Sequence, residues 1–303
     1  MRLLITGGSG LLGGNLTFMS AREGIETYAA YCSRPVKIAG ATTFSLDITQ
    51  RSDVLSKIEE IQPDVIIHTA AVTKPDVCEE DQGLAWRVNV TGTENLVQAA
   101  KITQTKFIYL STDLVFDGRA GLYREDDPTN PLSCYAWTKL EGEKIVTANS
   151  TNCCIVRTAV IYGPSIGGGS FSEWVIRGLK EGQQVPLFVD QFRSPILVTN
   201  LAQALLEICH RGITGLYHLG GAERINRLDF GRILTQEYGF PEANLPPVAM
   251  DDFGFKAPRP KDCSFDISRA KKTFKVRFLG AKEGIKRLKE LEDEGYPEQL
   301  RKG

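Results

Sequence analysis

The sequence predicts an α/β protein in which a doubly wound parallel sheet carries a smaller C-terminal lobe. Three observations predict this fold class. Short apolar runs alternate with helical patterns through the first half of the chain, which is typical of a parallel sheet with helices on both faces. A glycine-rich turn follows the first apolar run. After Tyr162 the elements become shorter and richer in proline, which indicates a second lobe.

Composition limits the classes of function. A chain of 303 residues can bury a large core, and a net charge of −1 excludes a general nucleic-acid or membrane-surface binder. The chain opens directly into a strand and has no apolar run long enough to span a bilayer, so we expect a cytoplasmic protein without a signal peptide. Seven cysteines without a C-x-x-C pair are expected to stay reduced, and three scattered histidines predict no metal site.

The first expected elements are a strand over 3–5, a glycine turn and a helix. A glycine motif between a strand and a helix is typical of a dinucleotide-binding site. Gly7 would allow the tight exit from the strand, Gly10 the close approach of a pyrophosphate, and Gly13 close packing of the helix on the sheet. The glycine pattern fits two registers of the fingerprint, one beginning at Gly7 and one at Gly8. The alternative to a cofactor site is a glycine-rich turn that binds no ligand. The predicted cofactor-binding residues of this segment are Gly7, Gly10, Leu11, Leu12 and Gly13.

The end of the second strand predicts the cofactor. An NAD site usually has a carboxylate about 20 residues past the glycines. This chain offers Ser33 and Arg34 instead, and a hydroxyl beside a guanidinium suits a 2′-phosphate. We therefore expect NADPH, with NADH as the alternative, unless Arg34 is only a solvated loop residue. Asp47 and Ile48, after the third strand, are expected near the adenine.

The remaining elements follow in order. Strands are expected at 26–32, 42–46, 64–68, 106–111 and 153–157, and helices at 53–60, 82–101, 135–147 and 282–292. A flexible connector at 163–170 then leads into the second lobe. The predicted division is a Rossmann-type dinucleotide-binding domain over 1–162, to which 196–220 returns, and a substrate-binding lobe over 163–195 and 221–303.

The expected chemistry lies at the fifth strand and the helix after it. Tyr135 and Lys139 are one helical turn apart, on the same face. A phenol has a pKa of about 10, and a nearby ammonium lowers it, which would make Tyr135 a usable proton relay. An exposed helix pair without function is the alternative. Thr112 lies at the carboxyl end of the strand, where ligands of open α/β sheets gather. Its hydroxyl would help to hold a carbonyl oxygen.

These motifs together resemble the extended short-chain dehydrogenase/reductase superfamily. The likeness rests on Thr6-Gly7-x-x-Gly10-x-x-Gly13, Asp47, Thr69-Ala70-Ala71, Asn89, Tyr135-x-x-x-Lys139 and the segment from Arg157 to Pro164. The segments 111–118 and 123–131 resemble the dTDP-4-dehydrorhamnose reductases, of rhamnose biosynthesis. The resemblance implies NADPH-dependent reduction of a nucleotide-linked 4-keto-6-deoxy sugar, in which hydride is transferred to the keto carbon. It implies no metal, and a homodimer is possible.

The resemblance also implies residue roles. Tyr135 is the acid/base, Lys139 its partner, Thr112 takes the superfamily's Ser/Thr place, and Asp113 matches an acidic residue of the subfamily. Thr69, Ala70, Ala71 and Asn89 join Tyr135 and Lys139 in the cofactor-binding set; Asn89 would steady the site, unless it is an ordinary polar helix residue. Arg193 and Arg259 are candidate ligands of a substrate diphosphate, or else surface or ion-pair arginines.

The chain also departs from the reductase pattern. The segment 71–76 lacks the residues usual beside the substrate, and the chain is also similar to the regulatory β subunit of methionine adenosyltransferase. A non-catalytic, cofactor-binding regulator and a nucleotide-sugar epimerase therefore remain as alternatives. A dehydratase is disfavoured because Leu114, not a glutamate, follows Asp113.

Overall fold

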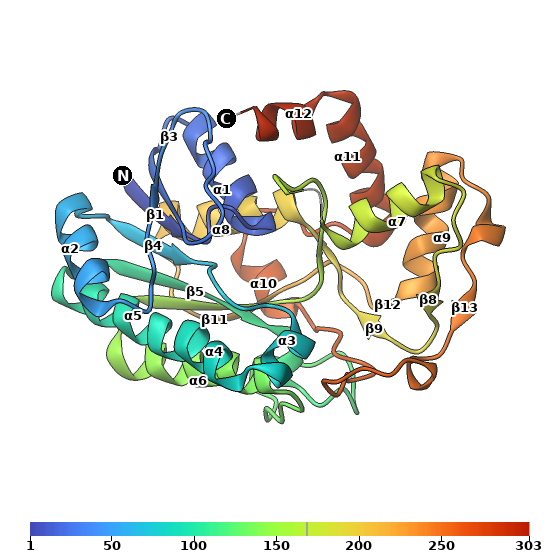
Figure 1. Cartoon of the computed structure of the whole chain (residues 1–303), viewed down its shortest axis with the longest axis horizontal. Coiled ribbons are helices and arrows are strands. Elements are labelled where there is room, and N and C mark those ends of the chain that lie inside the picture. Colours follow the sequence, from blue (N-terminus) through green and yellow to red (C-terminus); the bar gives the residue numbers. More distant parts are fainter. Residues whose placement is uncertain (168, 303) are drawn as a thin grey trace.

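The computed structural model describes residues 1–167 and 169–302 and places a parallel seven-stranded sheet at the centre of the molecule (Figure 1). The strand order is β11-β6-β5-β4-β1-β2-β3. The strands are β1 (Arg2–Thr6), β2 (Glu26–Tyr31), β3 (Ala41–Ser45), β4 (Val65–His68), β5 (Lys106–Thr112), β6 (Cys153–Thr158) and β11 (Gly215–Leu219). The predicted fold class is confirmed, because all neighbouring strands of this sheet run parallel.

Helices cover both faces of the sheet (Figure 1). One face carries α1 (Leu11–Arg22), α8 (Val198–Arg211) and α10 (Ser268–Thr273), and the other carries α2 (Arg51–Ile61), α5 (Gly92–Ile102) and α6 (Cys134–Asn149). Successive residues of β1 point to opposite faces, so Leu3 and Ile5 enter the core beneath α1 and α8 while Leu4 enters the core beneath α2 and α5. The strands are therefore continuous apolar runs, as expected for a doubly covered sheet.

The strand order reverses beside β1. The chain builds β1, β2 and β3 outward in one direction and then crosses back to place β4 on the other side of β1. In the register of the sheet, Thr6 lies opposite Ala30 on one neighbour and His68 on the other. A crevice forms outside the carboxyl ends of strands at such a reversal, and open α/β sheets bind their ligands there.

The long helix expected over 82–101 is present and contains one π-helical turn. The structure has α3 (Pro75–Glu80), α4 (Gln82–Trp86), the π-helical segment η1 (Arg87–Thr91) and then α5. The side chain of Asn89, inside η1, bonds to the backbone of Val72 and fixes this segment against the end of β4. Single π-helical turns of this kind are frequent at functional sites.

The remaining elements are helices and short strand pairs around a second core, which Phe18, Val36 and Ile38 of the first domain also join. The helices of this second lobe are α7 (Phe171–Lys180), α9 (Arg227–Tyr238), α11 (Ala281–Asp293) and α12 (Tyr296–Arg301). The strand pairs are β7 (Ile161–Tyr162) with β10 (Ile196–Leu197), β9 (Phe192–Arg193) with β12 (Ile225–Asn226), and β8 (Leu187–Phe188) with β13 (Pro247–Val248). Short 3₁₀ turns are η2 (Asp113–Val115), η3 (Glu242–Asn244) and η4 (Met250–Asp252).

The chain returns to the sheet as expected, through α8 and β11. Part of the predicted lobe also packs with the sheet, because Phe265, Phe274 and Phe278 belong to the core beneath α1 and α8. The predicted connector at 163–170 and the lobe segment 221–303 each include one residue, 168 and 303, that lies outside the described residues. Within the described ranges, no helix has the length and apolar character needed to cross a membrane.

Candidate active site

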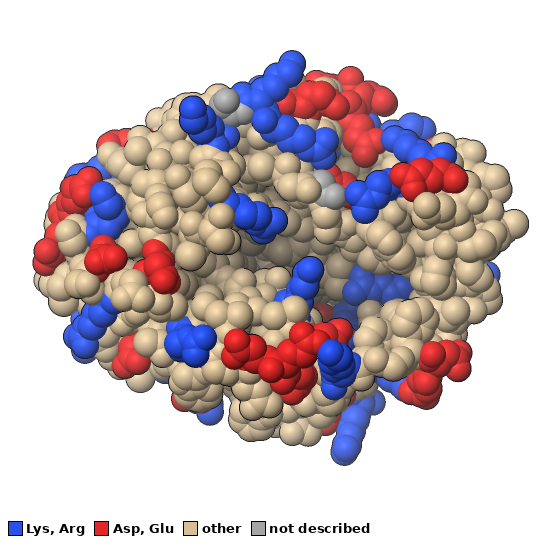
Figure 2. Space-filling model, in the orientation of Figure 1, with Lys and Arg blue, Asp and Glu red and all other residues tan. Residues whose placement is uncertain are grey.

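A cavity of about 980 Å³ opens at the carboxyl ends of β1, β2, β4 and β5 and extends to the second lobe. The space-filling view shows this face of the molecule hollowed across its middle (Figure 2). The cavity is lined by every residue predicted for the site except Asn89. The structure thus brings together residues that lie between positions 7 and 259 of the sequence.

The glycine turn has the geometry that its residues predict. Gly7 has φ of +77°, a conformation that other residues rarely adopt, and Gly10 is the N-cap of α1. A Cβ at Gly13, which both registers share, would overlap the carbonyl oxygen of Gly7. Gly8 packs on Ala29 of β2. The first turn of α1 has neither a capping side chain nor an acidic residue, which leaves its positive end available to a phosphate.

The residues expected around the adenosine end line the cavity from three segments. Ser33 and Arg34 are exposed just beyond β2, and Arg34 reaches toward Gly167 across the cavity. Asp47 accepts hydrogen bonds from the backbone N and the hydroxyl of Thr49, at 2.9 and 2.8 Å, and the backbone bond is the main cause of its lowered pKa. The carboxylate therefore stabilises the turn after β3.

Asn89 lies behind the cavity wall. Its Oδ1 accepts from Val72 N at 2.8 Å, and its Nδ2 donates to Val72 O at 3.1 Å and to Thr138 Oγ1 at 3.0 Å. The amide is fully buried and ties the segment after β4 to α6, the helix of Tyr135. In this position Asn89 supports the wall of the cavity and has no cavity surface of its own.

The structure corrects the expected electrostatics of Tyr135. Burial raises the pKa of the Tyr135 phenol above its usual range, and an interaction with the Thr112 side chain opposes this only in part. Lys139 does not lower it, because burial also lowers the pKa of the Lys139 ammonium, to about 7, although Glu143 opposes the shift. The Lys139 Nζ lies 4.1 Å from the centre of the Tyr109 ring, in cation–π contact.

A buried ion pair joins α6, the helix of Tyr135 and Lys139, to strand β6 of the sheet. Arg157 of β6 donates two hydrogen bonds to Glu143, from Nε at 2.9 Å and from Nη2 at 2.8 Å. Ser111 donates to the same carboxylate at 2.5 Å. Three hydrogen bonds from these two residues therefore satisfy Glu143, one helical turn beyond Lys139, and fix α6 on the sheet.

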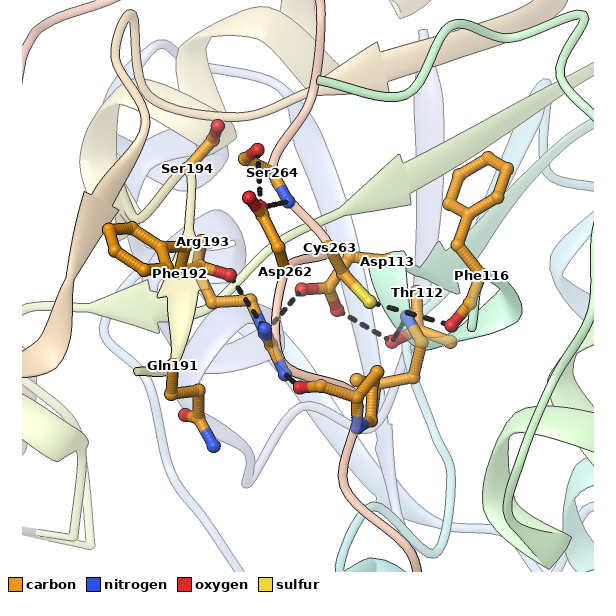
Figure 3. A network of polar contacts seen from close by, with 12 residues as sticks. Thr112, Asp113, Phe116, Gln191, Phe192, Arg193, Ser194, Asp262, Cys263 and Ser264 are labelled. Atoms are coloured by element: carbon orange, nitrogen blue, oxygen red, sulfur yellow. Dashed lines mark hydrogen bonds and ion pairs between the residues drawn. The ribbon is translucent and has the colours of Figure 1, made fainter. Parts of the chain in front are cut away.

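Asp113 is held by the second lobe. Its Oδ2 contacts Arg193 Nε at 3.1 Å, and its Oδ1 accepts from the Thr112 hydroxyl at 3.1 Å (Figure 3). Arg193 also donates to the carbonyl oxygens of Phe192, Pro260 and Lys261. Both charges are almost fully buried, so this pair joins the end of β5 to the lobe. The guanidinium of Arg193, predicted to bind a substrate phosphate, is largely occupied by protein partners.

The segment that departs from the reductase pattern contacts the other predicted phosphate ligand. Asp76 accepts from Arg259 Nη2 at 2.7 Å and from the backbone N of Ala257 at 2.9 Å. The Nη1 of Arg259 is buried without a hydrogen-bond partner in the described part of the chain. Segment 71–76 thus joins the end of β4 to the lobe at the wall of the cavity.

Sequence reasoning missed Arg227. It is the first residue of α9 and lines the cavity beside Gln191 and Phe171. No motif surrounds it, and the only local signal is the N-cap Asn226, which predicts a helix start and no ligand. Across residues 1–167 and 169–302, the structure has no His, Cys, Asp or Glu cluster that could hold a metal ion. The seven cysteines are free thiols.

Comparisons with known proteins agree with this arrangement. The model of the family described as RmlD substrate binding domain matches residues 1–292. The dTDP-4-dehydrorhamnose reductase of Mycobacterium tuberculosis is 34% identical over 265 residues, which is 85% of this chain and 82% of the relative. Methionine adenosyltransferase 2 subunit beta of Xenopus tropicalis is 30% identical over 278 residues, which is 89% of this chain and 82% of the relative.

A solved structure is similar along nearly the whole chain. The crystal structure of dTDP-4-dehydrorhamnose reductase from Bacillus anthracis, in complex with NADP, superposes with a TM-score of 0.85. It is 30% identical, and the match covers 95% of this chain and 98% of that one. The likeness therefore spans both the sheet and the second lobe.

Proposed function

The chain belongs to the RmlD substrate binding domain family, and from this premise we propose that it is an NADPH-dependent reductase of a nucleotide-linked 4-keto-6-deoxy sugar. One observation carries the proposal: the glycine turn and the group Thr112, Tyr135 and Lys139 line the same cavity. A dinucleotide site and a proton donor side by side are what carbonyl reduction needs. The similarity to dTDP-4-dehydrorhamnose reductases over both lobes supports the same activity.

The residues present fit the cofactor. The close approach of Gly7, Gly10 and Gly13 leaves backbone N–H groups at the uncapped end of α1 for the pyrophosphate. Arg34 and Ser33 line the cavity beyond β2, and a guanidinium beside a hydroxyl suits a 2′-phosphate, which favours NADPH, with NADH as the alternative. When bound, the cofactor supplies the hydride that the substrate carbonyl carbon accepts. NADP in the Bacillus anthracis reductase is consistent with this assignment.

The chain's own residues perform the proton chemistry. Tyr135 donates its phenolic proton to the carbonyl oxygen as that oxygen gains electron density. Its raised pKa keeps the phenol protonated before the reaction, as a general acid requires. Thr112 lies beside the phenol, and Lys139, one helical turn beyond Tyr135, provides positive charge near the developing alkoxide in its protonated form. Asp113, fixed by Arg193, orients the Thr112 hydroxyl.

Stoichiometric oxidation of NADPH tests the proposal. Purified protein and NADPH are mixed with a panel of dTDP- and UDP-linked 4-keto-6-deoxyhexoses, and absorbance at the nicotinamide band is followed. We expect one NADPH to be consumed for each sugar reduced, with a new hydroxyl at C4. An epimerase would convert the sugar without net consumption of NADPH.

A second candidate function is a cofactor-binding regulatory subunit. The observation that favours it is the similarity to methionine adenosyltransferase 2 subunit beta, together with the altered segment 71–76. In that case the protein would bind NADPH, leave the whole sugar panel unreduced, and co-purify with another enzyme.

A further inference from the structure

Three arginines line the lobe side of the cavity, and two of them are neutralised by carboxylates. Arg193 contacts Asp113 at 3.1 Å, and Arg259 contacts Asp76 at 2.7 Å. The third, Arg227, has no carboxylate within 4.0 Å in residues 1–167 and 169–302. The cluster of three guanidinium groups therefore retains one positive charge that the described protein does not balance.

The guanidinium of Arg227 is fixed in place, and its outer nitrogens remain free. Its Nε donates to Gln191 Oε1 at 2.8 Å, and its Cζ lies 4.5 Å from the centre of the Phe171 ring. These two contacts hold one edge and one face of the planar group. Within the described ranges, its Nη1 and Nη2 donate to no protein acceptor, and neither is among the fully buried polar atoms. Both nitrogens therefore open into the cavity.

Arg227 is partly buried, and partial burial makes an unbalanced charge unfavourable. Desolvation lowers the pKa of Arg227 to about 9, the neighbouring Arg193 acts in the same direction, and Asp113 opposes them. A buried charge without a counter-ion is retained in proteins mainly where a ligand supplies the opposite charge. A guanidinium offers parallel N–H groups that match the oxygens of a phosphate or a carboxylate.

We infer that Arg227 binds an oxyanion of the substrate, supplied by the diphosphate of the nucleotide sugar. The inference rests on the proposed function, in which the substrate is a nucleotide sugar. Arg193, by contrast, is a positioning residue, because its contacts with Asp113 and with backbone carbonyls fix the floor of the site. Arg227 is then the cation of this wall that is available to the substrate.

The test measures binding without turnover. Affinities of the full-length chain for dTDP, UDP, UDP-glucose and UDP-glucuronate are determined by calorimetry for wild type, R227Q and R227K. Arg232→Gln is the matched control, because Arg232 lies on the same helix and pairs at the surface with Asp229 and Glu242. We expect R227Q to weaken binding by about 30-fold or more, since one partner of a buried charge pair is removed. R227K should recover part of the affinity, and NADP binding should stay unchanged.

The four ligands separate binding of the diphosphate from binding of a sugar carboxylate. Equal losses for all four nucleotides indicate the diphosphate and support the inference, whereas a loss confined to UDP-glucuronate indicates a sugar carboxylate and contradicts it. The inference is overturned if R227Q binds every nucleotide as tightly as the wild type does. It is also overturned if the substitution weakens only the binding of NADP, or if the wild-type protein binds none of the four nucleotides. The reductase proposal fails through a different readout, the absence of NADPH oxidation, so the two failures are distinguishable.

Discussion

Replacement of Lys139 by methionine should stabilise the protein and abolish its activity. Burial lowers the pKa of this ammonium from 10.5 to about 7, so folding brings a charge into surroundings that disfavour it. At about 1.36 kcal/mol for each pKa unit, the cost at pH 7 is about 4 kcal/mol. Methionine has similar length and no charge, so Lys139→Met should remove most of this cost. For a chain of 303 residues, that corresponds to a rise in Tm of about 6 °C.

The pH dependence of this stabilisation follows from the two protonation states. Below about pH 7 the lysine carries its proton in both the folded and the unfolded chain, so the advantage of methionine is complete there. Between pH 7 and 10.5 the unfolded chain still holds the proton while the folded chain has released it. The advantage therefore shrinks as the pH rises through this window and is lost near its upper end.

Thermal denaturation at several pH values, followed by circular dichroism, measures the effect. Lys144→Met is the control, because Lys144 lies on the same helix but is exposed and paired with Glu141, so its Tm should change by about 1 °C or less. A Lys139→Met protein that melts at or below the wild-type temperature at pH 7 would refute the reasoning.

Three further substitutions test the site. Tyr135→Phe should lower kcat by about 10²–10⁴-fold, because the proton donor is lost, with unchanged NADPH affinity by fluorescence titration; equal turnover would remove Tyr135 from the mechanism. Gly13→Ala should abolish NADPH binding in calorimetry, because the new Cβ overlaps the Gly7 carbonyl, whereas Gly254→Ala, where nothing lies within 4 Å, should bind normally. Arg34→Glu should reverse the preference for NADPH over NADH in steady-state kinetics, and an unchanged ratio would place the 2′-phosphate elsewhere.

The fold could be predicted because its signals are local. Buried parallel strands are apolar runs such as Val65–His68, and the glycine turn has one position, Gly7, whose backbone conformation only glycine adopts readily. The π-helical segment Arg87–Thr91 could not be predicted, because one extra residue in a turn barely disturbs the helical spacing of apolar side chains. It becomes recognisable only through the bonds of Asn89 to the distant Val72.

The electrostatics of the site depend on contacts between distant segments. The pairing of Asp113 with Arg193 joins residues far apart in the sequence, and no spacing rule connects them. The expectation for Tyr135 considered only Lys139, one helical turn away, whereas burial by the surrounding structure decides the direction of its pKa. The role inferred for Arg227 likewise depends on its surroundings in the fold, because no carboxylate of the described structure pairs with it as Asp113 and Asp76 pair with Arg193 and Arg259.

Transfer of deuterium from labelled cofactor tests the central claim most directly. NADPH carrying deuterium at the reactive C4 position is incubated with the protein and a dTDP-4-keto-6-deoxyhexose, and the sugar product is analysed by mass spectrometry and NMR. A reductase of the proposed kind transfers the label to C4 of the sugar, with one NADPH consumed per product and with the label absent from the Tyr135→Phe reaction at equal times. Unlabelled sugar and intact NADPH, from protein that binds the cofactor, would contradict the assignment.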